Sequence, residues 1–257
     1  LLRMQPCMQK SAEIAARAAI HSLREGIPLR TVNREKLAAE LLESGCLNTI
    51  LPDCSFAADE AELRAMMGSD KPGEAIFLTG RNLSRYRPFL LELLDSGDPC
   101  AAPHSALALG LGGDPAGLPV LRQLVRERDS FVPQSSRAQN QRRILGAVDL
   151  LGRLGDAQDA ELLFEILSAM PPDLQLCSHV VRSLLELGDR LPECREKVRN
   201  SIESLLQSDA FDDMLLLKNS SSIPGNVYEP LKPSLRKLAD RHFAAWSHHD
   251  TGHRTLS

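Results

Sequence analysis

Apolar side chains recur every three or four residues along most of this chain, and that spacing places them on one face of an α-helix. Two clear instances are Leu118, Leu121, Leu124 and Val125, and Ala160, Leu163, Phe164 and Leu167. The pattern predicts an all-α fold, with further helices at 6–25, 34–44, 173–187, 191–207 and 231–246. Residues 219–230 are rich in Ser, Asn, Gly and Pro and are expected to be a loop.

The dipeptide Gly-Asp recurs after residue 73, at 97–98, 113–114, 155–156 and 188–189. Glycine can take the left-handed backbone that ends one helix, and aspartate can accept hydrogen bonds from the N–H groups that open the next. The separation of the second and third pairs matches the ~40–47 residue period of HEAT-type repeats. The region therefore resembles a HEAT/armadillo-like α–α superhelix, in which neighbouring helical hairpins share one hydrophobic core.

These patterns divide the chain into four parts. Residues 1–52 hold a pair of helices, and residues 53–72 are expected to be a linker with one short helical stretch at 59–67. HEAT-like helical repeats occupy 73–246, and residues 247–257 are expected to be a flexible tail. The chain opens Leu-Leu-Arg without an initiator Met and enters a helix almost at once. We therefore expect it to be the C-terminal part of a longer protein.

Composition and charge narrow the possible functions. Of 257 residues, 43% are apolar and 4% aromatic, and the preponderance of Leu and Ala favours helices over sheets. The net charge of -4 does not supply the concentrated positive field that nucleic acid or an anionic membrane surface requires. No apolar run approaches the ~20 residues of a membrane span. The six cysteines form no C-x-x-C pair, so we expect free thiols and a cytoplasmic location.

The opening segment carries the most specific motif. The segment contains, in this order, an arginine (Arg3), a Cys-Met pair (Cys7 and Met8), an Ala-rich helix (12–19), a Gly-x-Pro turn (Gly26 and Pro28) and a second helix (33–45). This order resembles the last stretch of FAD-dependent oxidoreductases that have two dinucleotide-binding domains. In that family the N-terminus of the first helix points at the pyrimidine edge of the flavin, where its free N–H groups stabilise the reduced ring. The resemblance implies a cofactor-binding set of Arg3, Cys7, Met8 and Gln9.

The same segment departs from the family pattern in two places. Ser11 and Ala15 stand where the family usually has glycine in the helix, and Pro28 comes one residue early. No predicted strand is followed by the phosphate-binding G-x-G-x-x-G motif, and the near match GLGGDPAG follows a helix. We therefore expect FAD only in the context of a longer protein, with an upstream flavin domain as partner, and none on the isolated chain. The alternative is an Ala-rich helix that only packs against its neighbour.

Two functions remain open at this point. The chain is either the C-terminal part of an FAD-dependent oxidoreductase, with repeats for docking or oligomerisation, or a non-enzymatic scaffold whose repeats bind another protein. Catalytic residues are unknown. Cys7, Cys100, Cys177 and Cys194 have no base nearby in the sequence and are expected to be packing residues.

Two further clusters contain candidate ligands. His248, His249 and His253, with Asp250 between them, are metal-ligand types, but the segment is terminal and polar, so no metal site is expected. An Arg-rich region is interleaved with acidic residues and nearly lacks aromatic ones, which favours a solvated face or a contact for a partner domain over nucleic-acid binding. Its arginines are Arg81, Arg85, Arg87, Arg122, Arg126, Arg128, Arg137, Arg142 and Arg143.

Overall fold

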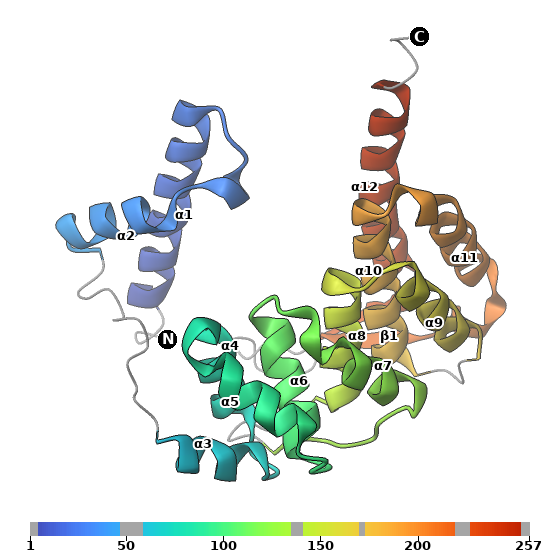
Figure 1. Ribbon diagram of the computed structural model, residues 1–257. Coiled ribbons are helices and arrows are strands. Elements are labelled where there is room, and N and C mark those ends of the chain that lie inside the picture. Colours follow the sequence, from blue (N-terminus) through green and yellow to red (C-terminus); the bar gives the residue numbers. More distant parts are fainter. Residues whose placement is uncertain (1–4, 47–58, 135–140, 170–172, 219–226, 253–257) are drawn as a thin grey trace. The chain divides into compact units, whose positions relative to one another are not determined.

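The computed structural model describes residues 5–46, 59–134, 141–169, 173–218 and 227–252, and it divides into two compact units, Leu1–Ala57 and Ala58–Ser257 (Figure 1). Both units are mostly helical, so the all-α prediction is confirmed. A short pair of strands in the second unit is the only sheet among the described residues. Within the described ranges, the first unit has one hydrophobic cluster, and the second unit has two.

The first unit contains the predicted pair of helices. Helix α1 spans Gln5–Glu25, a 3₁₀ turn follows at Leu29–Thr31, and α2 spans Arg34–Glu43. Asn33 begins α2 as predicted, because its side-chain oxygen accepts a hydrogen bond from the N–H of Lys36 at 3.0 Å. The two helices and the turn between them enclose a small core of Val32, Leu37, Leu41 and Cys46.

The second unit begins inside the segment that the sequence predicts to be a linker. Helix α3 spans Glu60–Met67, and its Leu63 and Met67 side chains are fully buried in a core shared with the next helices. Two apolar residues one turn apart are enough to anchor the helix there. Part of the expected linker at 53–72 is therefore folded into the second unit, while residues 53–58 lie outside the described part of the chain.

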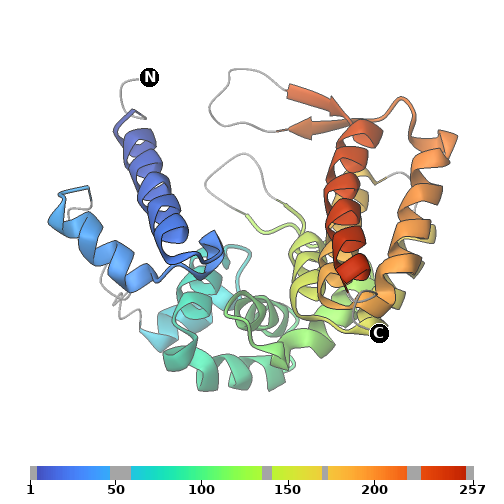
Figure 2. The ribbon, with the colours of Figure 1, turned by 90° about the horizontal axis from the view of Figure 1, so that it is seen from above.

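The rest of the second unit is a succession of helical hairpins. Its helices are α4 (Gly73–Arg81), α5 (Leu83–Asp95), α6 (Ala101–Leu111), α7 (Leu118–Arg126), α8 (Arg143–Leu154), α9 (Ala157–Ser168), α10 (Leu174–Arg190), α11 (Arg195–Gln207) and α12 (Leu231–Gly252). Short 3₁₀ turns lie at Pro115–Gly117, Pro192–Cys194 and Asp209–Phe211. Helix α6 packs against α4, α5, α7 and α8, and α10 packs against α8, α9, α11 and α12. Consecutive hairpins therefore touch (Figure 2).

Three of the predicted Gly-Asp pairs lie between two helices, and in the third, Gly155-Asp156, the aspartate caps the next helix as predicted but the glycine is not left-handed. Gly97 and Gly113 have φ of 71° and 87°, the left-handed backbone that ends a helix. The carboxylate after Gly97, on Asp98, accepts hydrogen bonds from the next backbone N–H groups at 2.7 and 2.8 Å. Gly155 instead has an extended backbone with φ of -68°. Glycine is needed there for space, because an added Cβ would lie 2.4 Å from the carbonyl oxygen of Leu151.

The fourth pair, Gly188 and Asp189, lies inside α10 and marks no turn, so that prediction is wrong. Both residues contact α12 instead. A Cβ added to Gly188 would lie 2.5 Å from a ring carbon of Trp246. The Asp189 carboxylate accepts from Trp246 Nε1 at 2.7 Å and lies 3.0 Å from His242 Nδ1. The pair is where α12 docks on α10.

The predicted loop at 219–230 is partly strand. Strands β1 (Leu215–Lys218) and β2 (Val227–Pro230) pair antiparallel, with Leu216 opposite Glu229, and residues 219–226 lie outside the description. The backbone N–H of Leu231 then donates to the carbonyl of Met214 at 2.9 Å, which ties the start of α12 to the hairpin. Helix α12 continues to Gly252, within the expected tail at 247–257.

Candidate functional site

The residues that resemble a flavin site lie at the start of α1. Cys7, Met8 and Gln9 are in its first turns, but their side chains, like the whole of Arg3, lie outside the described residues. The first backbone N–H groups of any α-helix have no partner within the helix. Helix α1, which begins at Gln5, therefore supplies backbone donors where the resemblance places the flavin edge.

One face of α1 is apolar and exposed within its unit. Ala12, Ala16, Ile20 and Leu23 follow one another at helical spacing, and Ile20 and Leu23 are 45% and 82% exposed. The opposite face carries the buried His21, whose Nε2 lies 2.8 Å from a carboxylate oxygen of Glu40 on α2. The small core thus uses only one side of the helix, and the slim apolar side is left uncovered by the first unit.

Three of the arginines that the sequence places on a solvated face, Arg122, Arg142 and Arg143, are instead paired and at least partly buried within the second unit. Arg122 donates to both carboxylate oxygens of Asp159 at 2.7 and 2.8 Å, and the Asp159 side chain is fully buried. These hydrogen bonds raise the pKa of Arg122. Arg142 pairs with Asp173 at 2.6 Å. A solvated face is therefore the wrong description of Arg122, Arg142 and the buried Arg143. It holds for the arginines that are exposed, which are Arg81, Arg85, Arg87, Arg126 and Arg128, while Arg137 lies outside the described residues.

Arg143 is the most buried of the set, at 7% exposure. It donates to both oxygens of Asp129 at 2.9 Å, and its guanidinium lies 4.5 Å from the ring centre of Phe131. On its other side is His104, which is fully buried with Nδ1 2.7 Å from the carbonyl of Met67. Since a carbonyl can only accept, Nδ1 carries the proton, and burial lowers the pKa of this histidine. The cluster links α3, α6 and α8, so its role is to hold these three helices together.

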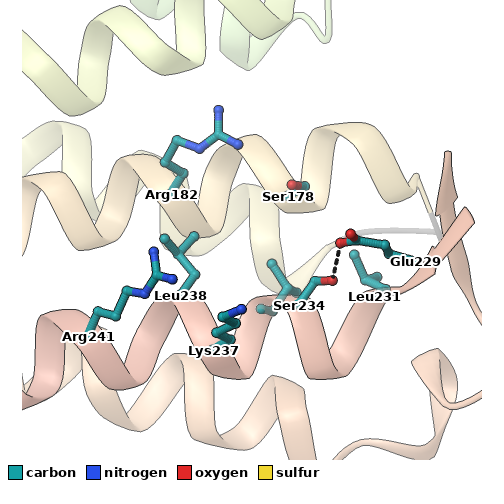
Figure 3. A pocket seen from close by; sticks show the side chains of 9 residues that line it. Ser178, Arg182, Glu229, Leu231, Ser234, Lys237, Leu238 and Arg241 are labelled. Atoms are coloured by element: carbon teal, nitrogen blue, oxygen red, sulfur yellow. Dashed lines mark hydrogen bonds between the residues drawn. The ribbon is translucent and has the colours of Figure 1, made fainter. Parts of the chain in front are cut away.

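An open pocket of about 310 Å³ lies between α10, α12 and the end of β2 (Figure 3). Its apolar part includes Leu231 and Leu235, which are 0% and 3% exposed, and the partly buried Leu238. The polar and charged residues of its lining are Ser178, Arg182, Glu229, Ser234, Lys237 and Arg241.

The charges of this pocket are arranged by sign. Figure 3 shows Arg182 of α10 and Arg241 of α12 at one end, Glu229 at the other, and Lys237 between them. The three cationic side chains are exposed, and none makes a hydrogen bond or an ion pair with any described residue. Glu229 accepts a hydrogen bond from Ser234 Oγ at 3.0 Å. The pocket therefore offers three cations that make no ion pair within the described part of the chain, beside an apolar floor.

A second pocket, of about 530 Å³, lies between α9, α11 and the 3₁₀ turn that follows α11. Hydroxyl, amide and apolar side chains make up its lining, which comprises Phe164, Leu167, Ser168, Asn200, Ser201, Ser204, Leu205, Ser208 and Phe211. No charged side chain is among these lining residues, so this pocket has no strong electrostatic preference for a ligand.

Metal binding and thiol reactivity depend on the arrangement of the His, Cys, Asp and Glu side chains in the described part of the chain. Its residues contain no group of three His, Cys, Asp or Glu side chains able to hold a metal ion, and the side chains of His248, His249, Asp250 and His253 lie outside it. Cys46, Cys177 and Cys194 are buried free thiols, and Cys100 is half-buried. Burial raises the pKa of Cys177 to about 11, which keeps it protonated and unreactive.

None of the pocket residues is singled out by the sequence. Arg182 lies on α10, whereas Lys237 and Arg241 lie one turn apart on α12, and α11 and the strand pair separate the two helices in the chain. The available signal was a pair of cations one turn apart beside the apolar positions Leu231, Leu235 and Leu238.

Within the described residues no helix combines the length and apolarity needed to cross a lipid bilayer. In comparisons with known proteins, the chain matches no protein-family model, no curated protein and no solved structure. Its function is therefore inferred from its own residues.

Proposed function

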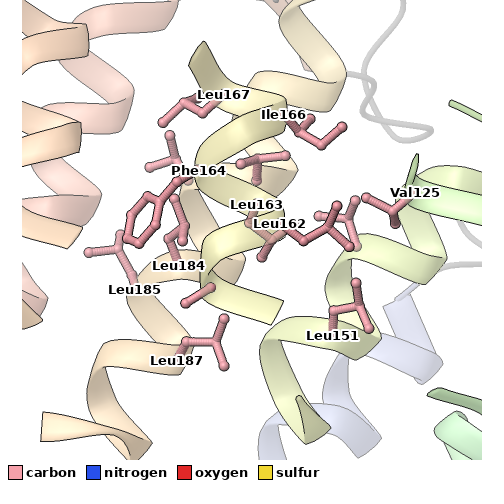
Figure 4. Close-up of a cluster of buried hydrophobic side chains, with 14 of the residues drawn as sticks. Val125, Leu151, Leu162, Leu163, Phe164, Ile166, Leu167, Leu184, Leu185 and Leu187 are labelled. Carbon is pink, nitrogen blue, oxygen red and sulfur yellow. The ribbon is translucent and has the colours of Figure 1, made fainter. Parts of the chain in front are cut away.

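We propose that the second unit is a HEAT-like stack of helical hairpins that binds another protein. The observation that carries this proposal is a hydrophobic cluster that extends from Ala106 on α6 to Trp246 on α12. Figure 4 shows part of it, with labelled side chains from α7 to α10. A hairpin with one apolar face is stable only when its neighbours cover that face, and rows of such hairpins present long surfaces that bind proteins.

Ion pairs between neighbouring hairpins support the repeat relationship. Arg87 on α5 pairs with Asp114, which lies in the turn between α6 and α7. Arg122 on α7 pairs in the same way with Asp156 and Asp159 at the turn between α8 and α9. In both cases the second helix of one hairpin donates to the turn carboxylate of the next. This recurrence is what repeated structural units with a common register would produce.

Site-specific photocrosslinking in the cells from which the protein derives tests the scaffold. A photoreactive amino acid replaces Lys237 in the α10–α12 pocket or, in a second variant, Asn200 in the α9–α11 pocket, and crosslinked proteins are identified by mass spectrometry. We expect a reproducible partner that also binds the purified chain in calorimetry. Crosslinks confined to the chain itself, or a crosslinked protein that does not bind when purified, contradict the proposal.

For the first unit we propose a second role, as the closing part of the flavin domain of an FAD-dependent oxidoreductase. Two features support it: the start of α1 at Gln5, and the uncovered face of Ala12, Ala16, Ile20 and Leu23, which an adjoining domain would cover. The first-turn N–H groups of α1 fit a flavin edge, but the described residues contain no glycine-rich turn between a strand and a helix that could bind the pyrophosphate.

The flavin role is tested by absorbance spectroscopy. The chain is expressed together with any coding sequence that precedes it, and the purified product is examined for a flavin spectrum. We expect bound FAD in the longer product and none in the isolated chain. A colourless longer product, or one without a dinucleotide-binding motif, rules this role out and leaves the scaffold proposal unaffected.

A further inference from the structure

We propose that the pocket between α10 and α12 binds an acidic segment of the partner protein, with the partner's carboxylates on Arg182, Lys237 and Arg241 and an adjacent apolar side chain on the leucine floor. This inference rests on the proposed role of the second unit as a protein-binding stack. It names the chemistry that the partner must present.

The cations favour a carboxylate ligand because none of them is satisfied within the described structure. Arg182 and Arg241 lie at one end of the pocket with Lys237 next along it, in a chain whose net charge is -4, so their grouping does not reflect a generally basic composition. Arginine side chains form two parallel hydrogen bonds with a carboxylate. A ligand with two or more carboxylates can therefore engage both arginines at once.

Among the described residues, no acidic side chain near the pocket forms an ion pair with its three cations. Glu186, one turn beyond Arg182 on α10, does attract that arginine, but burial outweighs this attraction and raises the pKa of the carboxyl. Asp240, next to Arg241, has an oxygen 3.9 Å from Arg236 on the preceding turn. Glu229 lies at the opposite end and bonds Ser234. An acidic ligand is thus attracted toward the arginine end of the pocket.

The leucine floor distinguishes a peptide from a simple anion. Leu238 is only partly buried and so keeps apolar surface that a ligand can contact, while the almost wholly buried Leu231 and Leu235 line the pocket beside it. About 310 Å³ is close to the lower limit of small-molecule pockets, roughly 300–1,000 Å³, and suits one or two side chains of an extended segment. A free phosphate would leave the floor unused. The lining has no aromatic ring on which a nucleic-acid base could stack.

Binding of labelled peptides to the full chain tests the proposal by fluorescence anisotropy. The probe peptide has a central leucine with two glutamates on each side. Matched peptides carry glutamine or lysine in place of glutamate, or alanine in place of leucine. We expect the glutamate–leucine peptide to bind about tenfold or more tightly than each of the others. Its binding should weaken as salt shortens the Debye length from ~10 Å at 0.1 M to ~3 Å at 1 M.

Protein variants locate the binding. The double variant Arg182→Glu/Arg241→Glu should lose at least about tenfold in affinity for the glutamate–leucine peptide. Arg126→Glu is the matched control, because Arg126 is an exposed arginine on α7 with no described partner and lies outside the pocket. It should leave the affinity unchanged. Circular dichroism confirms that both proteins are folded, and the peptide series tests the same idea without any change to the protein.

Inorganic phosphate and an oligouridylate are added as competitors in the same assay. Four results would overturn the inference. These are binding of the lysine peptide as tight as that of the glutamate–leucine peptide, a loss of affinity in Arg126→Glu as large as in the double variant, displacement of the peptide by inorganic phosphate alone, and tighter binding of the oligouridylate than of the peptide. A partner found by photocrosslinking whose affinity is the same for wild type and the double variant would keep the scaffold role and remove this pocket from it. Failure to find any partner, with the peptide still bound at the arginine end, would remove the scaffold role instead.

Discussion

Replacing Gly188 by alanine should destabilise the C-terminal end of the stack, even though alanine is the better helix former. An added Cβ would lie 2.5 and 2.7 Å from two ring carbons of Trp246, a separation at which something must move. The ring has little freedom to do so. It is 2% exposed, and its Nε1 donates to Asp189 at 2.7 Å.

The size of the effect follows from two opposed terms. Overpacking a core typically costs about 1–3 kcal/mol. The methyl group that Gly188→Ala adds would meet a fixed ring rather than a flexible chain end, so we expect a cost in the upper part of that range, about 2–3 kcal/mol. Alanine in the interior of a helix is favoured over glycine by about 1 kcal/mol. The net loss in the free energy of unfolding should therefore be about 1–2 kcal/mol.

Urea unfolding followed by tryptophan fluorescence measures this loss directly, because Trp246 is the only tryptophan. Gly146→Ala is the matched control. Gly146 is an exposed residue of α8, and an added Cβ would meet nothing closer than a Leu107 methyl group at 3.4 Å. That variant should gain up to about 1 kcal/mol. If Gly188→Ala is as stable as the wild type and its emission maximum does not move, the ring contact is not the reason for the glycine.

Three other outcomes are expected. Asp159→Ala should lower the free energy of unfolding by about 2–4 kcal/mol. This is somewhat less than the loss of a fully buried pair, because the Arg122 side chain is 21% exposed. The control Glu92→Ala removes one partner of an exposed pair and should change the free energy by less than about 0.5 kcal/mol in the same urea assay. Burial lowers the pKa of His104, so below the ordinary histidine value of about 6.5 the unfolded chain binds a proton more readily than the folded protein. The free energy of unfolding should therefore decrease as the pH is lowered below that value. When urea midpoints are compared across this range, the decrease should be shallower in His104→Asn. Iodoacetamide should modify Cys100 in the folded protein but Cys177 only after unfolding, as read by mass spectrometry; labelling of both at one rate would contradict the burial of Cys177.

Local signals predicted the helices well because their causes are local. The cap at Asn33 depends on a hydrogen bond to a residue three positions away, and the left-handed turns at Gly97 and Gly113 depend on the glycine itself. The apolar spacing within α7 and α9 likewise predicts which face is buried, and Leu121 and Leu163 are both fully buried.

The failures have tertiary causes. Gly188 and Asp189 read as a turn, but the space that Gly188 leaves is filled by Trp246, and Asp189 accepts from that ring's N–H. Both contacts come from a helix that begins only at Leu231. The same reason explains why the candidate pocket could not be predicted: Arg182 and Arg241 become neighbours in one cavity only after α12 docks on α10.

The docking of α12 also bears on how well the pocket can bind. Near one end of the helix, Trp246 is held by Gly188 and Asp189, and at the other the Leu231 N–H is held by Met214. Between them, Arg236 donates to both carboxylate oxygens of Glu203 on α11 at 2.6 and 2.8 Å. The helix that carries two of the three pocket cations is therefore fixed before a ligand arrives. A fixed wall removes part of the ordering entropy that binding would otherwise lose. The remaining loss falls on the exposed side chains of Arg182, Lys237 and Arg241, which lose rotamer freedom when a carboxylate holds them.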